Sequence, residues 1–289
     1  MSEKRLKLNK LTISAKAAVV VVFCIFAIYS ISLVFTLGWT FLQSLKGNRE
    51  FFRDMMSLPK SWLFSNYFEA FSKLERNGTT FIQMFANSIW FSVGLSVVGV
   101  FAHCITGYVF AKYKFPGRGV AFSFIIFTLI IPVVGNLPSM YKIVYLLRLN
   151  DSPLYLVTAL NGFGGNFLIM YAFFKGIADD YAEAAQIDGA SDLYIFLRIM
   201  LPLASGPIIA LSIVGIIFAW NNYETPIIFL DKMPNLASGL YYYREIIKYE
   251  SNEPIYLSGA LISTLPVLIL VAVFGNKIMK NMTMGGIKG

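Results

Sequence analysis

Histidine, cysteine and charged residues are scarce in this sequence. The chain of 289 residues holds one histidine and two cysteines, and only 14% of its residues are charged. A single histidine, His103, cannot form a histidine metal site, and Cys24 and Cys104 show no metal-ligand or disulfide spacing. Because cysteine usually packs as a small hydrophobe, we interpret all three as packing residues in apolar surroundings. We therefore expect no metal site and no disulfide framework.

Motifs of catalysis and of nucleotide binding are also missing. The sequence contains no glycine-rich Walker loop, no recognisable nucleophile–base pair and no carboxylate dyad defined by spacing. We therefore expect that this chain is not an enzyme and carries no cofactor of its own. The net charge of +8 is not arranged as a basic stripe with stacking aromatics, so we expect no nucleic-acid partner.

Apolar residues dominate what is present. Hydrophobic residues make up 57% of the chain, whereas soluble domains carry about 25% charged residues, so the solvent is expected to be lipid. A bilayer core needs roughly 20 apolar residues per helix, and backbone groups in lipid must pair within their own segment. The prediction is an all-α, polytopic membrane protein with six transmembrane helices. The expected spans are residues 17–42, 81–110, 119–147, 154–174, 203–230 and 255–278.

Basic residues predict the topology. The basic segment 1–16 precedes an apolar run longer than the roughly 7–15 residues of a signal peptide, which predicts a retained first span and a cytoplasmic N-terminus. Lysines and arginines after the second, fourth and sixth spans then lie in the cytoplasm. The long stretch 46–79 falls outside despite its basic residues, because the positive-inside rule weakens for long loops. One transmembrane domain, 1–289, would have an external segment at about 231–254 and a cytoplasmic tail at about 279–289.

Prolines, glycines and asparagines interrupt two of the spans. The third contains Pro132, Asn136 and Pro138, and the fourth contains Asn161, Asn166 and three glycines between them. Such residues bend or unwind a helix, which is tolerable at membrane depth only against protein or water. Kinked packing helices and a solute pathway are both open interpretations.

The segment at about 179–202 has a clear local pattern. Asp179–Ile187 reads as a short helix with an acidic start, which suits the positive N-terminal end of the helix dipole. Asp188-Gly189 is a turn signal, and Ser191 is a good N-cap for a second helix over Asp192–Met200. The pattern predicts two short helices joined by a tight bend on the cytoplasmic face. A solvated hairpin and a knob that docks into another protein are both consistent with it.

This segment resembles the EAA motif of ABC importer membrane subunits. Glu183-Ala184-Ala185 is followed after three residues by Gly189, and after nine more by Ile199-x-Leu201-Pro202, so every fixed position is present. Nearly the whole chain is similar to the carbohydrate branch, and to subunits like the smaller maltose-transporter permease. The stretches that carry this second resemblance are Asn87-Ser88, residues 108–118, Trp220-Asn221, Thr264-Leu265-Pro266 and the tail 284–289.

The resemblance implies a type I ABC importer permease fold in a bacterial cell membrane. It implies a second permease subunit, two ABC ATPase subunits that hold ATP and Mg, and an extracytoplasmic sugar-binding protein. The segment 179–202 would couple to the ATPase, and the tail Gly285–Gly289 would reach the same interface. The coupling residues would be Glu183, Ala184, Ala185, Asp188, Gly189 and Pro202.

Polar residues near the fifth span are candidates for a sugar pathway, together with Asn161 and Asn166. They are Trp220, Asn221, Asn222, Tyr223 and Glu224. Intramembrane ionisable residues are costly and often functional, and sugars bind through aromatic stacking and hydrogen bonds. Polar packing between helices and an interfacial position for Glu224 are the alternatives. Tyr241, Tyr242 and Tyr243 of the external segment would contact a partner or a sugar, or form an interfacial aromatic belt.

Other functions remain as alternatives to an oligosaccharide importer. A permease for glycerol phosphate or another solute uses similar subunits, although an anionic solute favours cations that the spans hardly provide. A secondary transporter would need a buried proton relay and usually repeated halves. A membrane-embedded enzyme or a scaffold protein would not need the full EAA spacing.

Overall fold

Helices form the regular elements of the structure, a computed structural model that describes residues 12–131, 135–245 and 252–283. The first half contains α1 (Ile13–Ser44), α2 (Asn48–Arg53), α3 (Ser65–Lys73), α4 (Phe81–Lys112), α5 (Arg118–Ile130), α6 (Leu137–Leu146) and the 3₁₀ helix η2 (Pro153–Ala159). The second half contains α7 (Gly165–Gly176), α8 (Asp180–Ile187), α9 (Asp192–Ile195), the π-helix η3 (Phe196–Met200), α10 (Leu201–Leu203), α11 (Ser205–Trp220), α12 (Glu224–Phe229), α13 (Leu236–Glu245) and α14 (Glu253–Thr283). The predicted all-α class is confirmed.

Three helices in the described part of the chain are long and apolar enough to cross a membrane. They are Ala15–Ser44, Phe81–Lys112 and Glu253–Gly275, and they coincide with the first, second and sixth expected spans. Local sequence explains their starts: Thr80 and Gln83 form a capping box at the beginning of α4. These spans confirm the membrane-protein prediction.

The other three expected spans are not single continuous helices, which corrects the sequence-based boundaries. The third divides into α5 and α6, the fourth into η2 and α7, and the fifth into α11 and α12. Pro132 lies outside the described residues, and Pro138 sits in the first turn of α6, where proline is tolerated. In the fourth span the chain leaves helical geometry at residues 160–164, where the glycines and Asn161 gather. The interruptions predicted in the third and fourth spans are therefore present, and each one divides its span into two separate helices.

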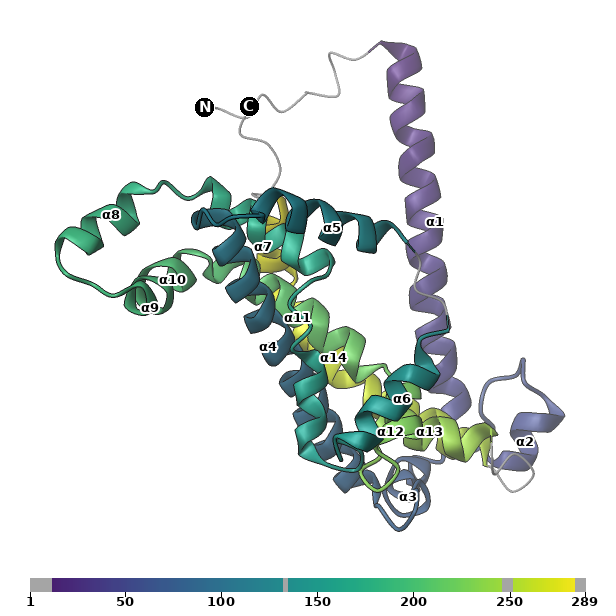
Figure 1. Ribbon diagram of the computed structural model, residues 1–289. Helices are drawn as coiled ribbons and strands as arrows, with labels where there is room; N and C mark the ends of the chain where they lie inside the picture. Colours follow the sequence, from purple (N-terminus) through teal and green to yellow (C-terminus); the bar gives the residue numbers. More distant parts are fainter. Residues whose placement is uncertain (1–11, 132–134, 246–251, 284–289) are drawn as a thin grey trace.

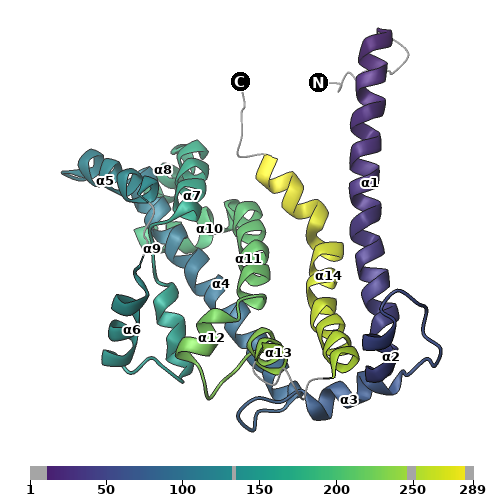
Figure 2. The ribbon, with the colours of Figure 1, turned by 90° about the vertical axis from the view of Figure 1, so that its right-hand side faces the viewer.

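The long helices stand in a row (Figure 2). α1 packs on α14, α14 on α11, and α11 on α4, while α7 packs on α4 and also contacts α11. The approach of α4 to α7 depends on Gly107, because a Cβ there would lie 2.9 Å from the backbone nitrogen of Tyr171. Small residues that allow such contact are typical of helix pairs in membranes. α4 is thus the central helix of the fold.

Of the three span-length helices, α1 is the least buried against the rest of the chain. None of its most apolar 18-residue window is buried within the chain, and Cys24 on this helix is exposed. The interpretation of Cys24 as a packing residue is therefore wrong within this chain, whereas Cys104 on α4 is buried as expected. An apolar helix with an apolar surface on every side fits lipid rather than water.

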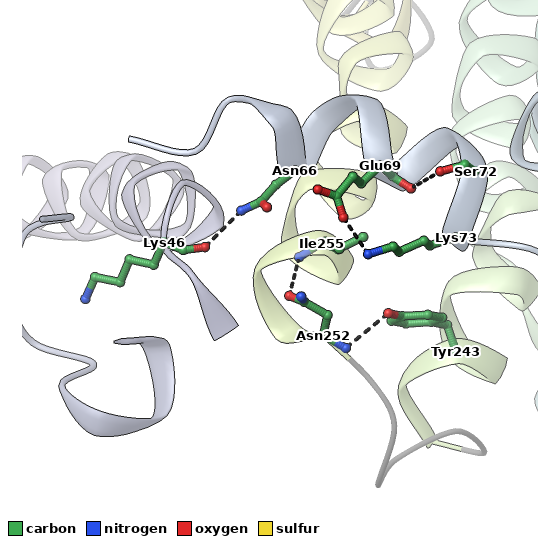
Figure 3. A network of polar contacts seen from close by, with 8 residues as sticks. All are labelled: Lys46, Asn66, Glu69, Ser72, Lys73, Tyr243, Asn252 and Ile255. Carbon is green, nitrogen blue, oxygen red and sulfur yellow. Dashed lines mark hydrogen bonds and ion pairs between the residues drawn. The ribbon is translucent and has the colours of Figure 1, made fainter. Parts of the chain in front are cut away.

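Polar contacts close the end of the molecule where α2, α3 and α13 gather (Figures 1 and 3). The Asn66 amide donates to the carbonyl oxygens of Ser44 at 2.7 Å and Lys46 at 2.9 Å. Ser44 is the last residue of α1 and Lys46 lies just beyond it, so neither carbonyl has a partner within the helix. The backbone N–H of Asn252 donates to the Tyr243 hydroxyl at 3.0 Å. The side-chain oxygen of Asn252 accepts from the backbone N–H of Ile255 at the start of α14.

Replacing Asn66 with alanine should destabilise this end of the protein. The change removes two hydrogen bonds, leaving the Lys46 carbonyl without this donor and the Ser44 carbonyl with only the longer bond from the Ser258 hydroxyl at 3.4 Å. This should cost about 2–3 kcal/mol and lower the thermal unfolding midpoint in detergent. Lys73→Ala is the matched control, because it removes only the exposed Lys73–Glu69 pair of the same helix, worth at most about 1 kcal/mol. Equal midpoints for both variants would contradict the role of Asn66.

Candidate functional site

The hairpin segment, residues 179–202, projects from the side of the bundle (Figure 1). Its first arm is α8, and its second arm is α9 with η3 and α10. Ser191 lies in extended geometry before α9, and its hydroxyl accepts from the Tyr194 amide at 3.3 Å. The two predicted helices, the bend between them and the Ser191 N-cap are all confirmed.

Gly189 makes the bend between the arms. Its φ of 81° is in the left-handed region, which costs other residues a steric penalty. Its amide donates to the Gln186 carbonyl at 3.0 Å, and the Ala190 amide donates to the Ala185 carbonyl at 2.9 Å. This pair of bonds is a Schellman motif, which closes the C-terminal end of α8. The glycine of the EAA pattern thus has a defined backbone role.

The surface of the hairpin combines exposed apolar and acidic side chains. Ile187 is 87% exposed and Leu193 is 66% exposed, although both lie outside the long apolar spans. Glu183, Ala184 and Asp188 are exposed as well. A hollow of about 620 Å³ lies within the bend, lined by Ala185, Asp188, Gly189, Ala190, Ser191, Tyr194, Arg198 and Ile199. Exposed apolar surface rimmed by polar groups marks a surface for another protein.

Lys112 fixes the base of the hairpin to the end of α4. Its ammonium donates to the Ile177 carbonyl and, at 2.6 Å, to the Asp179 carboxylate. Hydrogen bonding and charge from Lys112 lower the pKa of Asp179. The ion pair is therefore fully formed above the ordinary aspartate pKa and is lost only as the pH falls through the lowered value. Sequence reasoning used Lys112 for topology and within the stretch 108–118 that carries the family resemblance, and it missed this contact, which joins residues 67 positions apart.

The second arm is anchored in the core, unlike the first. Ile195, Phe196 and Met200 are buried with Tyr108 of α4 and Phe174 of α7 in one cluster. Pro202 lies in α10, immediately before a bend of 75° into α11. The second arm is therefore packed against α4 and α7 and continues into α11.

A second feature is an open hollow of about 400 Å³ between α4, α11 and the chain break at 160–164, lined by both apolar and polar residues. Three predicted pathway residues line it: Asn161, Asn166 and Asn222. The other lining residues are Leu95, Ser96, Gly99, Val100, His103, Ala159, Gly215, Phe218 and Ala219. His103 is thus placed at a cavity wall and not in uniform apolar packing. A lone histidine in an apolar span was the signal that could have indicated it.

The remaining predicted pathway residues lie elsewhere. Trp220 is buried, packs edge-on against Phe85, and donates its indole N–H to the Ser263 carbonyl at 2.9 Å. Asn221 donates to the Ile217 carbonyl of its own helix. Tyr223 stacks on Tyr241 with ring centroids 4.7 Å apart, and Glu224 is exposed at the first residue of α12. The structure does not bring these four residues into the cavity.

The segment 231–254, which the sequence predicts to be external, contacts the loop before α4. Arg76, whose side chain is only 6% exposed, pairs with Asp231 at 2.6 Å and lies over the Tyr242 ring. Tyr243 is buried and Tyr241 is exposed. The three tyrosines thus have three different environments and do not form one belt. Three stretches named in the predictions lie outside the described residues: 246–251 of this segment, the tail Gly285–Gly289 and most of the N-terminal segment.

Comparisons with known proteins agree on one family. Residues 96–280 match the family described as "Binding-protein-dependent transport system inner membrane component". The chain is 29% identical over 274 residues to the arabinooligosaccharides transport system permease protein AraQ of Bacillus subtilis, covering 91% of this chain and 94% of the relative. It is 25% identical over 262 residues to the diacetylchitobiose uptake system permease protein NgcG of Streptomyces coelicolor, covering 89% and 85%.

Another relative, named for a different substrate, has a similar sequence identity to this chain. The sn-glycerol-3-phosphate transport system permease protein UgpE of Pectobacterium atrosepticum is 26% identical over 246 residues, covering 83% of this chain and 87% of the relative. Among solved structures, a chain from a bacterial ABC transporter involved in the import of the acidic polysaccharide alginate superposes with a TM-score of 0.73 at 22% identity. The match covers 92% of this chain and 98% of that chain, and it supports the fold alone.

Replacing Lys112 with methionine should loosen the base of the hairpin. The variant keeps the length of the side chain but loses both hydrogen bonds, so backbone amides at 177–183 should exchange with deuterium about fivefold faster. Lys175→Met is the control, because Lys175 lies over the ring of Tyr171 and is not bonded to the hairpin. Equal exchange in both variants would show that Lys112 does not anchor the segment.

Proposed function

The chain belongs to the family of binding-protein-dependent transport system inner membrane components, and on that premise we propose that it is a membrane-spanning subunit of an ABC importer for oligosaccharides. In this proposal the hairpin segment docks on a separate ATPase subunit. The hydrolysis of ATP there drives alternating access of the membrane bundle. The observation that carries the proposal is a hairpin whose tip is exposed and whose base is built into the core.

The two arms of the hairpin suit these two tasks. The first arm presents Glu183 and Ala184 to the outside, and small side chains allow another protein to approach closely. Glu183 offers a carboxylate to a basic residue of the ATPase, and charge-assisted hydrogen bonds of this kind are among the stronger ones. The second arm continues through Pro202 into the bend before α11. A push on the tip therefore tilts α11 and α4 together.

The proposed assembly contains a second permease subunit, two ATPase subunits and an external sugar-binding protein. Support comes from the family, whose description names a binding protein, and from surface left uncovered on this chain. The 18-residue apolar window of α1 is unburied, and lipid or the second permease would cover it. ATP and Mg would bind to the ATPase subunits and not to this chain.

Oligosaccharide is proposed as the substrate class because several relatives are named for oligosaccharide transport. The glycerol phosphate relative makes an anionic solute the second candidate. The two classes differ in charge, so the chemistry of a solute site in the membrane can distinguish them.

Changes at the hairpin tip should separate the ATPase from the membrane subunits. With this chain tagged and co-expressed with its partner permease and ATPase, we expect the native chain to retain the ATPase during purification. Glu183→Arg should lose it because the charge is reversed, and Gly189→Pro should lose it because proline cannot adopt a φ of 81°. A loss of at least about tenfold in bound ATPase is expected for each.

Two controls keep this experiment specific. Glu69→Arg makes the same charge change on α3, far from the hairpin, and should retain the ATPase. Gly189→Asn should also retain it, because asparagine tolerates left-handed geometry. If a correctly inserted native chain holds no ATPase, the importer proposal is wrong and a secondary transporter becomes the better hypothesis.

A further inference from the structure

The chain between α1 and α3 forms a small lobe, residues 48–64, with many exposed apolar side chains. The lobe includes α2 and lies at the end of α1, at the edge of the molecule away from α4 and α7 (Figures 1 and 2). Met56 is 84% exposed. The other exposed apolar side chains of the lobe are Phe52, Met55, Leu58, Trp62 and Phe64. Such a concentration marks an interaction surface, whereas single exposed apolar residues are normal in water.

Hydrogen bonds inside the lobe hold these apolar side chains on its outside. Lys46, just before the lobe, is fully buried, and its ammonium donates to the Asp54 carbonyl at 2.7 Å. The Asp54 carboxylate accepts from the backbone N–H of Met56 at 3.2 Å, and the Glu50 carboxylate accepts from the backbone N–H of Lys60 at 2.7 Å. A buried lysine beside exposed methionines reverses the arrangement expected in water. The fold of the lobe is therefore suited to an apolar neighbour.

The depth of the lobe in the bilayer is set by α1. The backbone N–H of Leu63 donates to the Leu45 carbonyl at 2.8 Å, and Lys46 bonds to Asp54, so the lobe is tied to residues that directly follow α1. The apolar segment of α1, Ala15–Ser44, has 30 residues, which is about 45 Å of helix. A bilayer with its headgroups is about 40–45 Å thick. This match places the end of α1, and the lobe bound to it, at the level of the lipid headgroups.

Three basic side chains of the lobe have no acidic partner. Arg49, Arg53 and Lys60 are exposed, and none forms an ion pair within the part of the chain that the structure describes. Arg49 and Arg53 are four residues apart on α2, so they share one face of it. The two acids of the lobe, Glu50 and Asp54, accept from backbone N–H groups. The lobe thus presents free cations beside apolar side chains, a combination that fits the phosphate and the acyl chains of a phospholipid.

Position and charge favour lipid over a protein partner on this surface. The surface continues from α1, whose most apolar window is unburied within this chain, and Phe41 in the last turns of α1 is itself exposed. At headgroup depth a bilayer presents phosphates directly above apolar chains. The basic residues of the stretch 46–79 also run against the positive-inside rule, and lipid phosphates give three of them partners where they lie.

We propose that the lobe 48–64 is a binding surface for anionic phospholipid. Arg49, Arg53 and Lys60 bind the phosphates, and the exposed apolar side chains enter the leaflet beside them. This inference goes beyond the proposed function, because it requires only that the chain spans a bilayer. The side-chain oxygen of Asn48 accepts from the backbone N–H of Glu253 at 3.3 Å, which joins the lobe to the start of α14. Bound lipid therefore stabilises the packing of α1 against α14.

The first test measures lipid binding to the complete membrane complex, purified in detergent. Phosphatidylglycerol is titrated and the bound lipid is counted by native mass spectrometry, with phosphatidylcholine as the comparison without net charge. Arg49→Gln, Arg53→Gln and Lys60→Gln should each weaken phosphatidylglycerol binding about fivefold, since each removes one cation near an anionic surface. Lys73→Gln is the matched control, because its ammonium is already paired with Glu69, and it should leave the affinity unchanged.

Photo-crosslinking identifies what covers the apolar side of the lobe, and it does so with all three bases in place. Met56→p-benzoylphenylalanine is irradiated in nanodiscs of phosphatidylcholine and phosphatidylglycerol, with the binding protein present. It should give an adduct with the mass of one phospholipid. Ile187→p-benzoylphenylalanine is the control, because Ile187 is similarly exposed but lies on the hairpin segment, and it should give no lipid adduct.

The outcomes are distinct from those of the hairpin experiment. A polypeptide adduct at Met56, with the second permease or with the binding protein, would overturn the proposal and make the lobe a protein interface. Unchanged phosphatidylglycerol affinity in all three glutamine variants would overturn the role of the bases. Neither result depends on ATP hydrolysis or on the transported solute, so a failure here leaves the proposed function intact. A native complex without bound ATPase would likewise leave the lipid surface intact.

Discussion

The structure depends on one constraint: backbone groups inside a membrane must find hydrogen-bond partners within the protein. The long helices α1, α4 and α14 meet it through their own ladders. Where the chain leaves helical geometry, nearby side chains supply the partners. Thr106 serves the Gly162 carbonyl, and Asn235 donates to the Asn222 carbonyl at 2.9 Å. These hydrogen bonds allow the fourth and fifth expected spans to be broken beside α4, and residues at both breaks line the hollow there.

The same arrangement explains how a subunit without a catalytic site can take part in an energy-driven process. α4 contacts the cavity along its middle and the hairpin base at its end, through His103 and Lys112. α11 contacts the cavity on one side and follows the hairpin through the bend at Ala204 on the other. Both helices therefore connect the proposed ATPase contact with the cavity, and no flexible linker lies between them.

The relatives leave the substrate open between neutral and anionic solutes, since their printed names include both. The cavity favours the neutral class for a physical reason that is independent of those names. Transfer of a charge into an apolar environment is far more costly than transfer of a hydroxyl that finds partners. The feature that carries this distinction is the lining of the hollow, which contains no Asp, Glu, Lys or Arg among the described residues.

Sequence reasoning predicted those features of this protein that depend on neighbouring residues. Apolar runs indicated the membrane and the all-α class, and the family match confirms the type of transport protein. The hairpin was predicted nearly in full, because a Schellman glycine, an N-cap serine and an acidic first turn act within a few residues. The comparisons leave the functional roles of its residues as proposals.

Only the tertiary structure decided which polar residues meet. Trp220 and Asn221 looked like pathway residues but bond to Ser263 and Ile217, whereas His103 looked like packing and faces a cavity. The cavity is lined by three segments that are about 50 or more residues apart along the chain. Because the helices are apolar on nearly every side, no local sequence pattern indicates which face of a helix packs against which neighbour. The sequence alone therefore determined that helices form, that they lie in lipid and that a hairpin leaves them. Their mutual packing, set by small residues such as Gly107 and by the breaks beside α4, decided where a solute could be held.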